Sequence, residues 1–345
     1  MKGPALLPLI VGIPGPCLGK EELRILEENP VAGIILFARN ILDGEQTRTL
    51  IQQFRVLEPR PFVTVDLEGG MVNRLSAIWG DLPSMAEAAA AGAPAVFALG
   101  EAAGAACRFL GIHQDLAPVV DLRFPEALLA RQQRCLAEKP EDVARLARSF
   151  QEGLGRWCVS GCLKHFPGLG AVTIDTHQEL PRLELSAEDM EEHLQVFEAL
   201  SEEIPVVMVA HVIVPSLGDE THPASLSRSL VQKALNLPGH PVVLSDDIEM
   251  GALGGLGDLP ELVIAALRAH HHGVLVCNSL ERLPEIAASI AAECKEDPSF
   301  AHRLEEGIAR LGTLGHGLCL HSASVPAPDE TTVSQLWERA RLLSS

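Results

Sequence analysis

The stretch Phe62-Val-Thr-Val-Asp-Leu-Glu-Gly-Gly70 shows the pattern that decides the fold: a short apolar, β-branched run, then acidic residues, then a glycine turn. A continuously apolar strand has both faces buried, which is typical of a parallel sheet. Similar runs recur along the chain, and helical patterns separate them. The predicted strands are Leu6–Gly12, Gly33–Phe37, Phe62–Asp66, Asp115–Val120, Gly161–His165, Val206–His211, Val242–Asp246 and Gly273–Cys277.

Strands that alternate with helices in this way predict an α/β fold of the (β/α)8 TIM-barrel type, and 345 residues suit that fold. A doubly wound open sheet is the alternative, but the glycine-rich phosphate fingerprint often found after its first strand is missing. The predicted helices are Glu21–Glu28, Gly44–Val56, Ala93–Leu110, Glu141–Trp157, Ala187–Leu200, Ser229–Leu235 and Pro260–His271.

The C-terminal end differs in composition from the rest of the chain. Residues Ser322–Thr332 are rich in Pro, Ser and Ala, and a helical pattern follows around Val333–Leu343. We therefore expect residues 1–321 to form one barrel-shaped catalytic domain. Residues 322–345 are expected to be a linker and a C-terminal helix packed on the barrel.

The charge balance argues against a polyanionic partner. The formal net charge is −19, which would repel a polyphosphate backbone, so we expect no nucleic-acid binding. Apolar runs such as Leu262–Leu267 are far shorter than the roughly 20 residues of a membrane span. Prolines interrupt the apolar N-terminal segment, which favours a strand over a signal sequence. We expect a cytoplasmic protein with no membrane partner.

Cysteine and histidine spacing gives little indication of a metal. The chain has eight cysteines, which we expect to be reduced, and Cys158 and Cys162 have no matching second pair for zinc. His270–His272 stand at a predicted helix end, where solvent exposure and the helix dipole explain them better than metal binding. We expect neither a metal nor a cofactor.

Polar side chains collect where the predicted strands end. In a TIM barrel the carboxyl ends of the strands meet at one face, and active sites form there. Chemically competent groups at several strand ends therefore predict a catalytic site. They are Asp66 and Glu68 after the third strand, Lys164 and His165 at the fifth, His211 at the sixth, and Asp246 with Asp247 at the seventh.

Several longer motifs occur in one order along the chain, and with them the sequence resembles glycoside hydrolase family 3. Within that family it resembles the single-domain bacterial β-N-acetylglucosaminidases. The resemblance runs from about Gly3 to Cys277. Its motifs are Gly33-Ile-Ile-Leu-Phe-Ala-Arg-Asn40, Val63-Thr-Val-Asp-Leu-Glu-Gly-Gly-Met-Val-Asn-Arg74, Gly111-Ile-His-Gln-Asp-Leu-Ala-Pro-Val-Val-Asp121, Lys164-His-Phe-Pro-Gly168, Asp175-Thr-His177, Pro223-Ala-Ser-Leu-Ser227 and Ser245-Asp-Asp-Ile-Glu-Met-Gly251.

The resemblance implies a barrel enzyme that removes terminal β-linked N-acetylglucosamine with retention of configuration. Asp246 matches the family nucleophile, and a retaining mechanism needs such a carboxylate to form a glycosyl-enzyme intermediate. Asp175 and His177 match an unusual acid-base pair, in which the histidine protonates the departing oxygen and the aspartate orients the ring. Asp247 points the other way on the strand and is expected to serve hydrogen bonding or a helix cap.

The resemblance also implies which residues bind the sugar. For His211 two interpretations stay open: it contacts the sugar, or it is a packed histidine bonded to a neighbouring backbone. The residues that match family sugar-binding positions are Asp66, Arg74, Arg134, Lys164, His165 and His211.

The sequence departs from the family pattern around the expected substrate. Leu169 stands where a second histidine is usual after Lys164-His-Phe-Pro-Gly168, and Leu67 and Met71 replace common Gln and Arg residues. Arg134 is followed by Cys-Leu-Ala instead of the typical Ser-Phe-Gly. These changes affect the expected aglycone site more than the chemistry.

Aromatic residues make up only 4% of the chain, so a compact pocket for a chain-terminal sugar is expected rather than a long stacking platform. The resemblance then implies trimming of cell-wall (peptidoglycan) turnover fragments. We expect a monomer or weak homodimer. Three alternatives remain open. They are a β-N-acetylglucosaminide phosphorylase that uses phosphate, a β-glucosidase of the same family, and a non-catalytic sugar-binding protein.

Overall fold

The computed structural model describes residues 6–174 and 179–344. Within them, eight strands form one parallel sheet in the order β6-β3-β2-β1-β10-β9-β8-β7. The two outer strands also meet, because Asp115 N donates to Ser160 O (2.9 Å) and Val120 N donates to Lys164 O (2.8 Å). The sheet is therefore a closed barrel and not a doubly wound open sheet. Its strands are β1 (Leu7–Gly12), β2 (Val31–Leu36), β3 (Phe62–Val65), β6 (Gln114–Asp115), β7 (Leu163–Phe166), β8 (Val206–Val209), β9 (Val242–Asp247) and β10 (Gly273–Val276).

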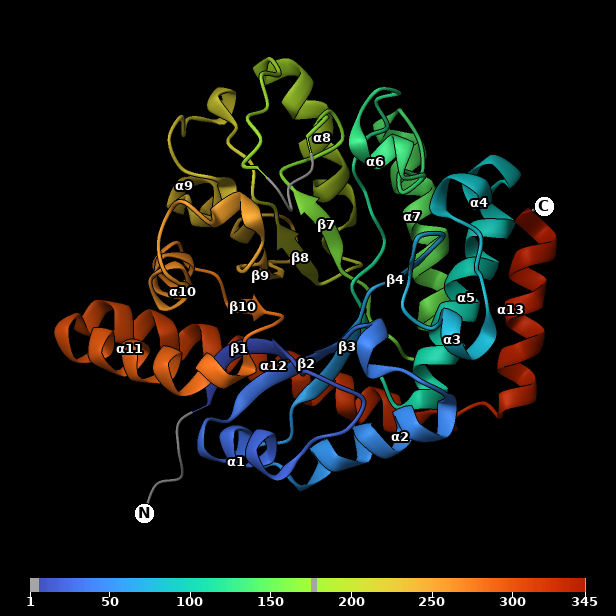
Figure 1. Cartoon of the computed structure of the whole chain (residues 1–345). Helices are drawn as coiled ribbons and strands as arrows, with labels where there is room; N and C mark the ends of the chain where they lie inside the picture. Colours follow the sequence, from blue (N-terminus) through green and yellow to red (C-terminus); the bar gives the residue numbers. More distant parts are fainter. Residues whose placement is uncertain (1–5, 175–178, 345) are drawn as a thin grey trace.

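Helices surround these strands (Figure 1). Each predicted helix is present, and two of them, α5 (Ala93–Leu110) and α8 (Ala187–Leu200), have the predicted bounds. After β3 the chain inserts a small antiparallel hairpin, β4 (Leu67–Gly69) with β5 (Val72–Asn73), above the barrel. The other helices are α1 (Lys20–Glu28), α2 (Gly44–Gln53), α3 (Ser76–Trp79), α4 (Met85–Ala91), α6 (Leu128–Arg131), α7 (Pro140–Gly155), α9 (Arg228–Leu235), α10 (Leu259–Arg268) and α11 (Leu283–Glu296).

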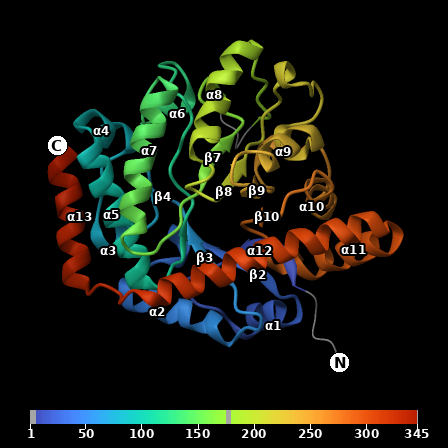
Figure 2. The same cartoon turned by 180° about the vertical axis from the view of Figure 1, so that it is seen from behind.

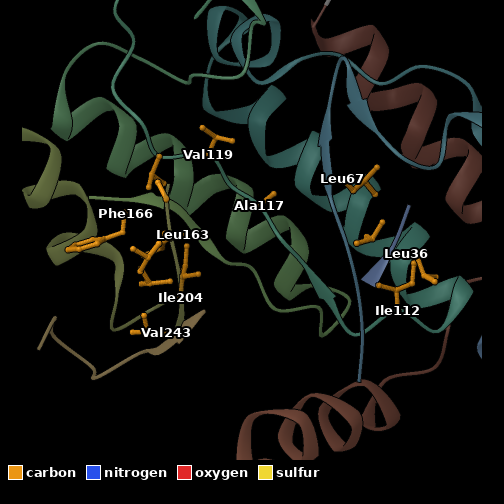
Figure 3. Close-up of a cluster of buried hydrophobic side chains, with 14 of the residues drawn as sticks. Leu36, Leu67, Ile112, Ala117, Val119, Leu163, Phe166, Ile204 and Val243 are labelled. Carbon is orange, nitrogen blue, oxygen red and sulfur yellow. The ribbon is translucent and has the colours of Figure 1, made fainter. Parts of the chain in front are cut away.

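The strands bury apolar side chains on both faces, as their continuous apolarity predicts. One cluster fills the interior of the barrel and includes Ile10, Ile35 and Leu275. A larger cluster lies between the strands and the surrounding helices, and Figure 3 shows part of it, with Leu163 and Phe166 of β7 close to one another. Alternation along each strand therefore separates two cores and leaves the polar strand ends above the inner one.

A long helix that the sequence analysis did not predict closes the other end of the barrel. Helix α12 (Pro298–Ser324) contacts β1, β2, β3, β9 and β10, as seen from behind in Figure 2. Leu311 and Leu318 of this helix pack into the inner cluster. Gly315 permits the close approach, because a Cβ there would lie 3.0 Å from the Phe62 ring. The predicted linker from Ser322 is thus partly wrong, since α12 continues to Ser324.

The C-terminal helix α13 (Glu330–Ser344) begins earlier than predicted and packs on α5 and α4. Its Trp337 is buried, with the ring centroid 5.5 Å from that of Trp79, and Nε1 donates to Asp81 O (3.2 Å). Helix α5 is long and apolar enough to cross a membrane by length and composition, but 67% of it is buried. It has the character of a core helix between α7 and α13.

Candidate active site

A cavity of about 360 Å³ opens at the carboxyl ends of the strands. Its wall contains six of the residues that the sequence analysis assigned to the site: Asp66, Arg74, Arg134, Lys164, His165 and Asp246. They come from the ends of β3, β7 and β9 and from the loops after β5 and α6, so strands distant in sequence bring them together. Asp175 and His177 lie outside the described residues, and the structure gives no geometry for them.

The floor of the cavity holds a buried ion network. Lys164 Nζ lies 2.9 Å from Asp66 Oδ1 and 2.6 Å from Glu68 Oε1. Burial alone would lower the pKa of Lys164, but these two carboxylates hold it above its ordinary value. Lys164 is therefore charged, and its contact with Asp66 fixes an acceptor and a donor side by side where sugar hydroxyls can bind both.

Arg134 reaches the same network from the loop after α6. Its Nε and one terminal nitrogen donate to the two oxygens of Glu68, at 2.8 and 2.9 Å. This bidentate geometry is the strongest form of an arginine–carboxylate pair. Burial would raise the pKa of Glu68, but Arg134 and Lys164 hold it below its ordinary range, so the carboxylate is ionised.

Arg74 is less constrained than the other two cations. Its guanidinium lies 4.0 Å from Asp66 Oδ2, and its Nε is buried without a hydrogen-bond partner. The group also lies 5.8 Å from the centroid of the Phe37 ring. A buried donor without an acceptor is costly, so Arg74 is ready to donate to a ligand in the cavity.

His165 is held by a buried aspartate. Its Nδ1 lies 2.8 Å from Asp121 Oδ2, and the second oxygen of Asp121 accepts the Leu169 amide at 2.5 Å. Because a carboxylate accepts, Nδ1 carries the proton, and Nε2 is the nitrogen left for the cavity. Asp121 therefore fixes both the His165 ring and the start of the loop after β7.

Asp246 is the second-last residue of β9 and lines the cavity, and its Oδ1 accepts the amide of Asp247 at 2.8 Å. Burial would raise the pKa of Asp246, but nearby His211 and His165 hold it below its ordinary value. The carboxylate is thus ionised, as a nucleophile must be.

The pKa of Asp247 is shifted in the opposite direction to that of Asp246, because burial raises it to about 7. Its Oδ1 accepts the amides of Glu249 and Cys277, each at 3.2 Å, so it bridges the loops after β9 and β10. Adjacent carboxyls thus have pKa values moved in opposite directions, and the hydrogen-bonding role predicted for Asp247 agrees with these contacts.

His211 is buried near Asp246. Its Nδ1 lies 2.6 Å from Ser225 Oγ, and its Nε2 lies 2.8 Å from Asp247 O. The contact with a backbone oxygen agrees with a packed histidine, and a contact of His211 with the sugar stays a prediction. Ser225 belongs to the motif Pro223-Ala-Ser-Leu-Ser227, whose part in the site is therefore to support a strand end.

The expectation that His270–His272 are solvent-exposed is wrong for His271 and His272, which are buried. His271 Nε2 lies 2.8 Å from Ser225 O, and His272 Nδ1 accepts the Val243 amide at 3.0 Å. Burial lowers the pKa of these rings to about 3 and about 4, so both are neutral. They join the end of α10 to the short helical turn Ala224–Leu226 and to β9. Within residues 6–174 and 179–344, no group of three or more His, Cys, Asp or Glu side chains could hold a metal.

Two buried carboxylates hold the cavity residues in place, although neither was predicted to do so. Glu68 was expected only as one of the polar groups at a strand end, and Asp121 was not singled out although it stands in a quoted motif. Both are buried and ionised, and they hold Lys164, Arg134 and His165. An acidic residue at a strand end looks the same in sequence whether it faces water or a buried cation. The signal that could have found Asp121 is its position directly after the predicted strand Asp115–Val120.

Comparison with known proteins agrees with this geometry. Residues 14–304 match the glycosyl hydrolase family 3 N terminal domain. The chain belongs to glycosyl hydrolase family 3. It is therefore a glycoside hydrolase with a family 3 (β/α)8 barrel.

Relatives align with this family 3 chain over most of its length. It is 30% identical over 342 residues to a protein named β-hexosaminidase from Idiomarina loihiensis, covering 96% of this chain and 98% of the relative. A protein of the same name from Stenotrophomonas maltophilia is 35% identical over 286 residues, covering 78% and 83%.

Solved structures of family 3 proteins have the same architecture. A β-N-acetylglucosaminidase from a Paenibacillus species superimposes with a TM-score of 0.88 at 25% identity, covering 98% of this chain and 67% of that one. NagZ from Neisseria gonorrhoeae in complex with N-trifluoroacetyl-D-glucosamine superimposes with a TM-score of 0.77 at 27% identity, covering 100% of both chains.

The departures from the family motifs occupy different places. Leu67 is fully buried in the outer core, beside other apolar residues in Figure 3, and does not line the cavity. Met71 and Leu169 both line it. Two of the three substitutions thus change the surface that a substrate meets.

Proposed function

We propose that this family 3 enzyme is a retaining exo-β-N-acetylglucosaminidase (β-N-acetylhexosaminidase). The observation that supports it most is the ionised Asp246 at the end of β9, in one cavity with the Asp66–Lys164 pair, Arg74 and His165. The relatives named β-hexosaminidase, and the NagZ structure that holds an N-acylated glucosamine, support the same substrate class.

In the proposed reaction, the terminal sugar binds with its hydroxyls on Asp66, Lys164 and Arg74. Asp246 attacks the anomeric carbon and forms a glycosyl ester while the aglycone oxygen leaves. His177, oriented by Asp175, protonates that oxygen and then removes a proton from the attacking water. The roles of His177 and Asp175 rest on the sequence motif, because both residues lie outside the described part of the chain.

Asp121 and Glu68 are positioning residues in this scheme. Asp121 sets the tautomer of His165 and the direction of the loop after β7, and Glu68 keeps Lys164 and Arg134 in place beneath the sugar. Preorganised charges of this kind need no rearrangement as positive charge develops on the sugar ring.

We further propose small glycans from cell-wall turnover, such as peptidoglycan fragments with a terminal N-acetylglucosamine, as the physiological substrates. The cavity volume of about 360 Å³, which suits a chain-terminal sugar, and the family resemblance support these substrates. The cytoplasm is the proposed compartment, and its support is the family resemblance alone.

Hydrolysis of aryl β-glycosides that differ only at the 2-substituent tests the function. We expect the 2-acetamido substrate to be cleaved much faster than the glucoside, with β-configured product formed first. Equal rates would indicate a β-glucosidase, and no turnover of any glycoside with binding retained would indicate a sugar-binding protein. Sugar 1-phosphate formed in phosphate buffer would instead identify a phosphorylase.

A further inference from the structure

We infer that the cavity contains an apolar aglycone subsite, built by Met71, Leu128, Leu169 and Val172, and that it favours a leaving group with hydrocarbon surface. The inference rests on the proposed function and specifies the substrate of the same site. The cavity lining combines the buried ion network with apolar side chains from three separate segments.

The ion network is where the terminal sugar binds. Its Lys164 and Asp66 side chains are 3% and 17% exposed, and they offer the donor and the acceptor that sugar hydroxyls need. In an exo-acting pocket, the group bonded to the anomeric carbon extends away from the groups that bind the terminal sugar. Apolar lining residues outside the ion network therefore contact the aglycone.

Three of the four apolar residues are joined through their backbones. Met71 lies in the turn between β4 and β5 and is 64% exposed. Leu128 N, at the start of α6, donates to Val172 O at 2.8 Å, and Val172 N donates to Leu169 O at 2.9 Å. One exposed methionine is ordinary, but a connected apolar wall beside a catalytic cavity forms a surface for a ligand.

Charge strengthens the inference. Of the cations that line the described cavity, Lys164 and Arg134 are paired with Glu68, and Arg74 lies beside Asp66. Each of these three cations thus lies beside a carboxylate of the ion network that binds the sugar. An anionic group over the apolar wall would lose hydration without gaining a partner there.

Leu169 is held in this wall by its backbone. Its amide donates to Asp121, the residue that also holds His165, and its side chain is 5% exposed. The family pattern has a histidine at this position, so an apolar side chain has replaced a hydrogen-bonding one in a fixed place. Leu169 is therefore a specificity-determining residue of this chain.

The test is kcat/KM for a series of alkyl β-N-acetylglucosaminides from propyl to hexyl, whose leaving groups have nearly the same chemistry. We expect kcat/KM to rise about twofold with each added methylene. Full burial of a methylene would raise kcat/KM roughly fourfold, and partial burial gives part of that gain. A hexyl chain ending in a carboxylate should lose that gain. A flat series, or equal rates for the hexyl and carboxyhexyl glycosides, would overturn the subsite while leaving the proposed function in place.

Variants localise the effect. Met71→Gln and Leu169→His should reduce the dependence on chain length, whereas Leu169→Met should keep it. Leu42→Gln, at a side chain that is 59% exposed and outside the cavity, is the matched control and should leave the series unchanged. An unaltered series in Met71→Gln and Leu169→His would contradict the inference. No turnover of any member of the series by the wild type would overturn the proposed function, and the subsite with it.

Discussion

Glu68 Oε1 and Lys164 Nζ lie 2.6 Å apart, with side chains 1% and 3% exposed, beneath the floor of the cavity. Glu68 also receives two hydrogen bonds from Arg134, so one carboxylate on β4 contacts two buried cations, and Asp66 supplies the second negative charge beside Lys164. The hairpin that carries Glu68 is short, but it also contributes Met71 and Val72 to the cavity wall. The ion network therefore connects the insertion after β3 to the barrel strand β7.

Glu68→Gln should destabilise the fold and impair catalysis together. The amide keeps the shape but leaves Lys164 and Arg134 with too little negative charge, and breaking a buried pair typically costs about 3–5 kcal/mol. We expect a loss of that order in the free energy of unfolding, measured in urea, and a lower kcat/KM. Glu296→Gln, at an exposed site on α11, is the control and should leave both quantities near the wild type.

Asp246→Asn should bind sugar and lose nearly all turnover, because an amide cannot form the covalent intermediate. A 2-fluoro glycosyl fluoride should label the wild type at Asp246, as peptide mass spectrometry would show. Label on Asp247 or Asp66 would contradict the assignment of the nucleophile.

Asp247→Asn should change how stability depends on pH. The Asp247 pKa is raised to about 7, so between roughly pH 4 and pH 7 the native protein binds more protons than the unfolded chain. Its contribution to stability is full below that window and falls as pH rises through it, by at most about 1.4 kcal/mol per pH unit.

The variant does not titrate there, so the unfolding free energy of the wild type minus that of Asp247→Asn should decrease from pH 4 to pH 7 and then level off. Asp81→Asn, at an exposed carboxyl, should show no such trend. A difference that stays constant across the window would contradict the raised pKa.

His177→Ala should impair cleavage most where the leaving group is poor. A sugar alcohol needs protonation, whereas a nitrophenolate leaves largely unaided, so the glycosyl-enzyme should still form from an aryl substrate. It should accumulate as a burst, and azide should speed its breakdown. Equal impairment on both substrates, without a burst or an azide effect, would exclude the acid-base role.

Seven strands of the sheet were predictable because a β-branched run with two buried faces has few alternatives. The predicted strand Asp115–Val120 is wrong in its bounds, since β6 is Gln114–Asp115 and overlaps it only at Asp115. Helix α12 was not predicted, since Gly307, Gly312, Gly315 and Gly317 lower its helix propensity; packing across the end of the barrel stabilises it instead. Tertiary contacts overrode the local pattern there.

The site likewise contains residues that were predictable and residues that were not. Motif order identified the residues that line the cavity, such as Asp66 and Lys164, because strand ends converge in a barrel. The same reasoning failed for His271, which is buried with its Nε2 2.8 Å from Ser225 O, and it did not pair Glu68 with the buried cations Lys164 and Arg134. Periodicity in the sequence predicts which face of a helix or strand is buried, but it does not predict which residue of another element that face contacts.

Helix α12 also determines the order in which the products leave the cavity. Since its Leu311 and Leu318 fill the amino-terminal end of the barrel, the sugar at the floor of the cavity sits behind its own aglycone. Departure must then be sequential: the aglycone leaves first, water enters by the same opening, and the free sugar leaves last. Kinetically, N-acetylglucosamine should compete with the substrate for the empty enzyme, whereas the released aglycone should inhibit in a mixed fashion.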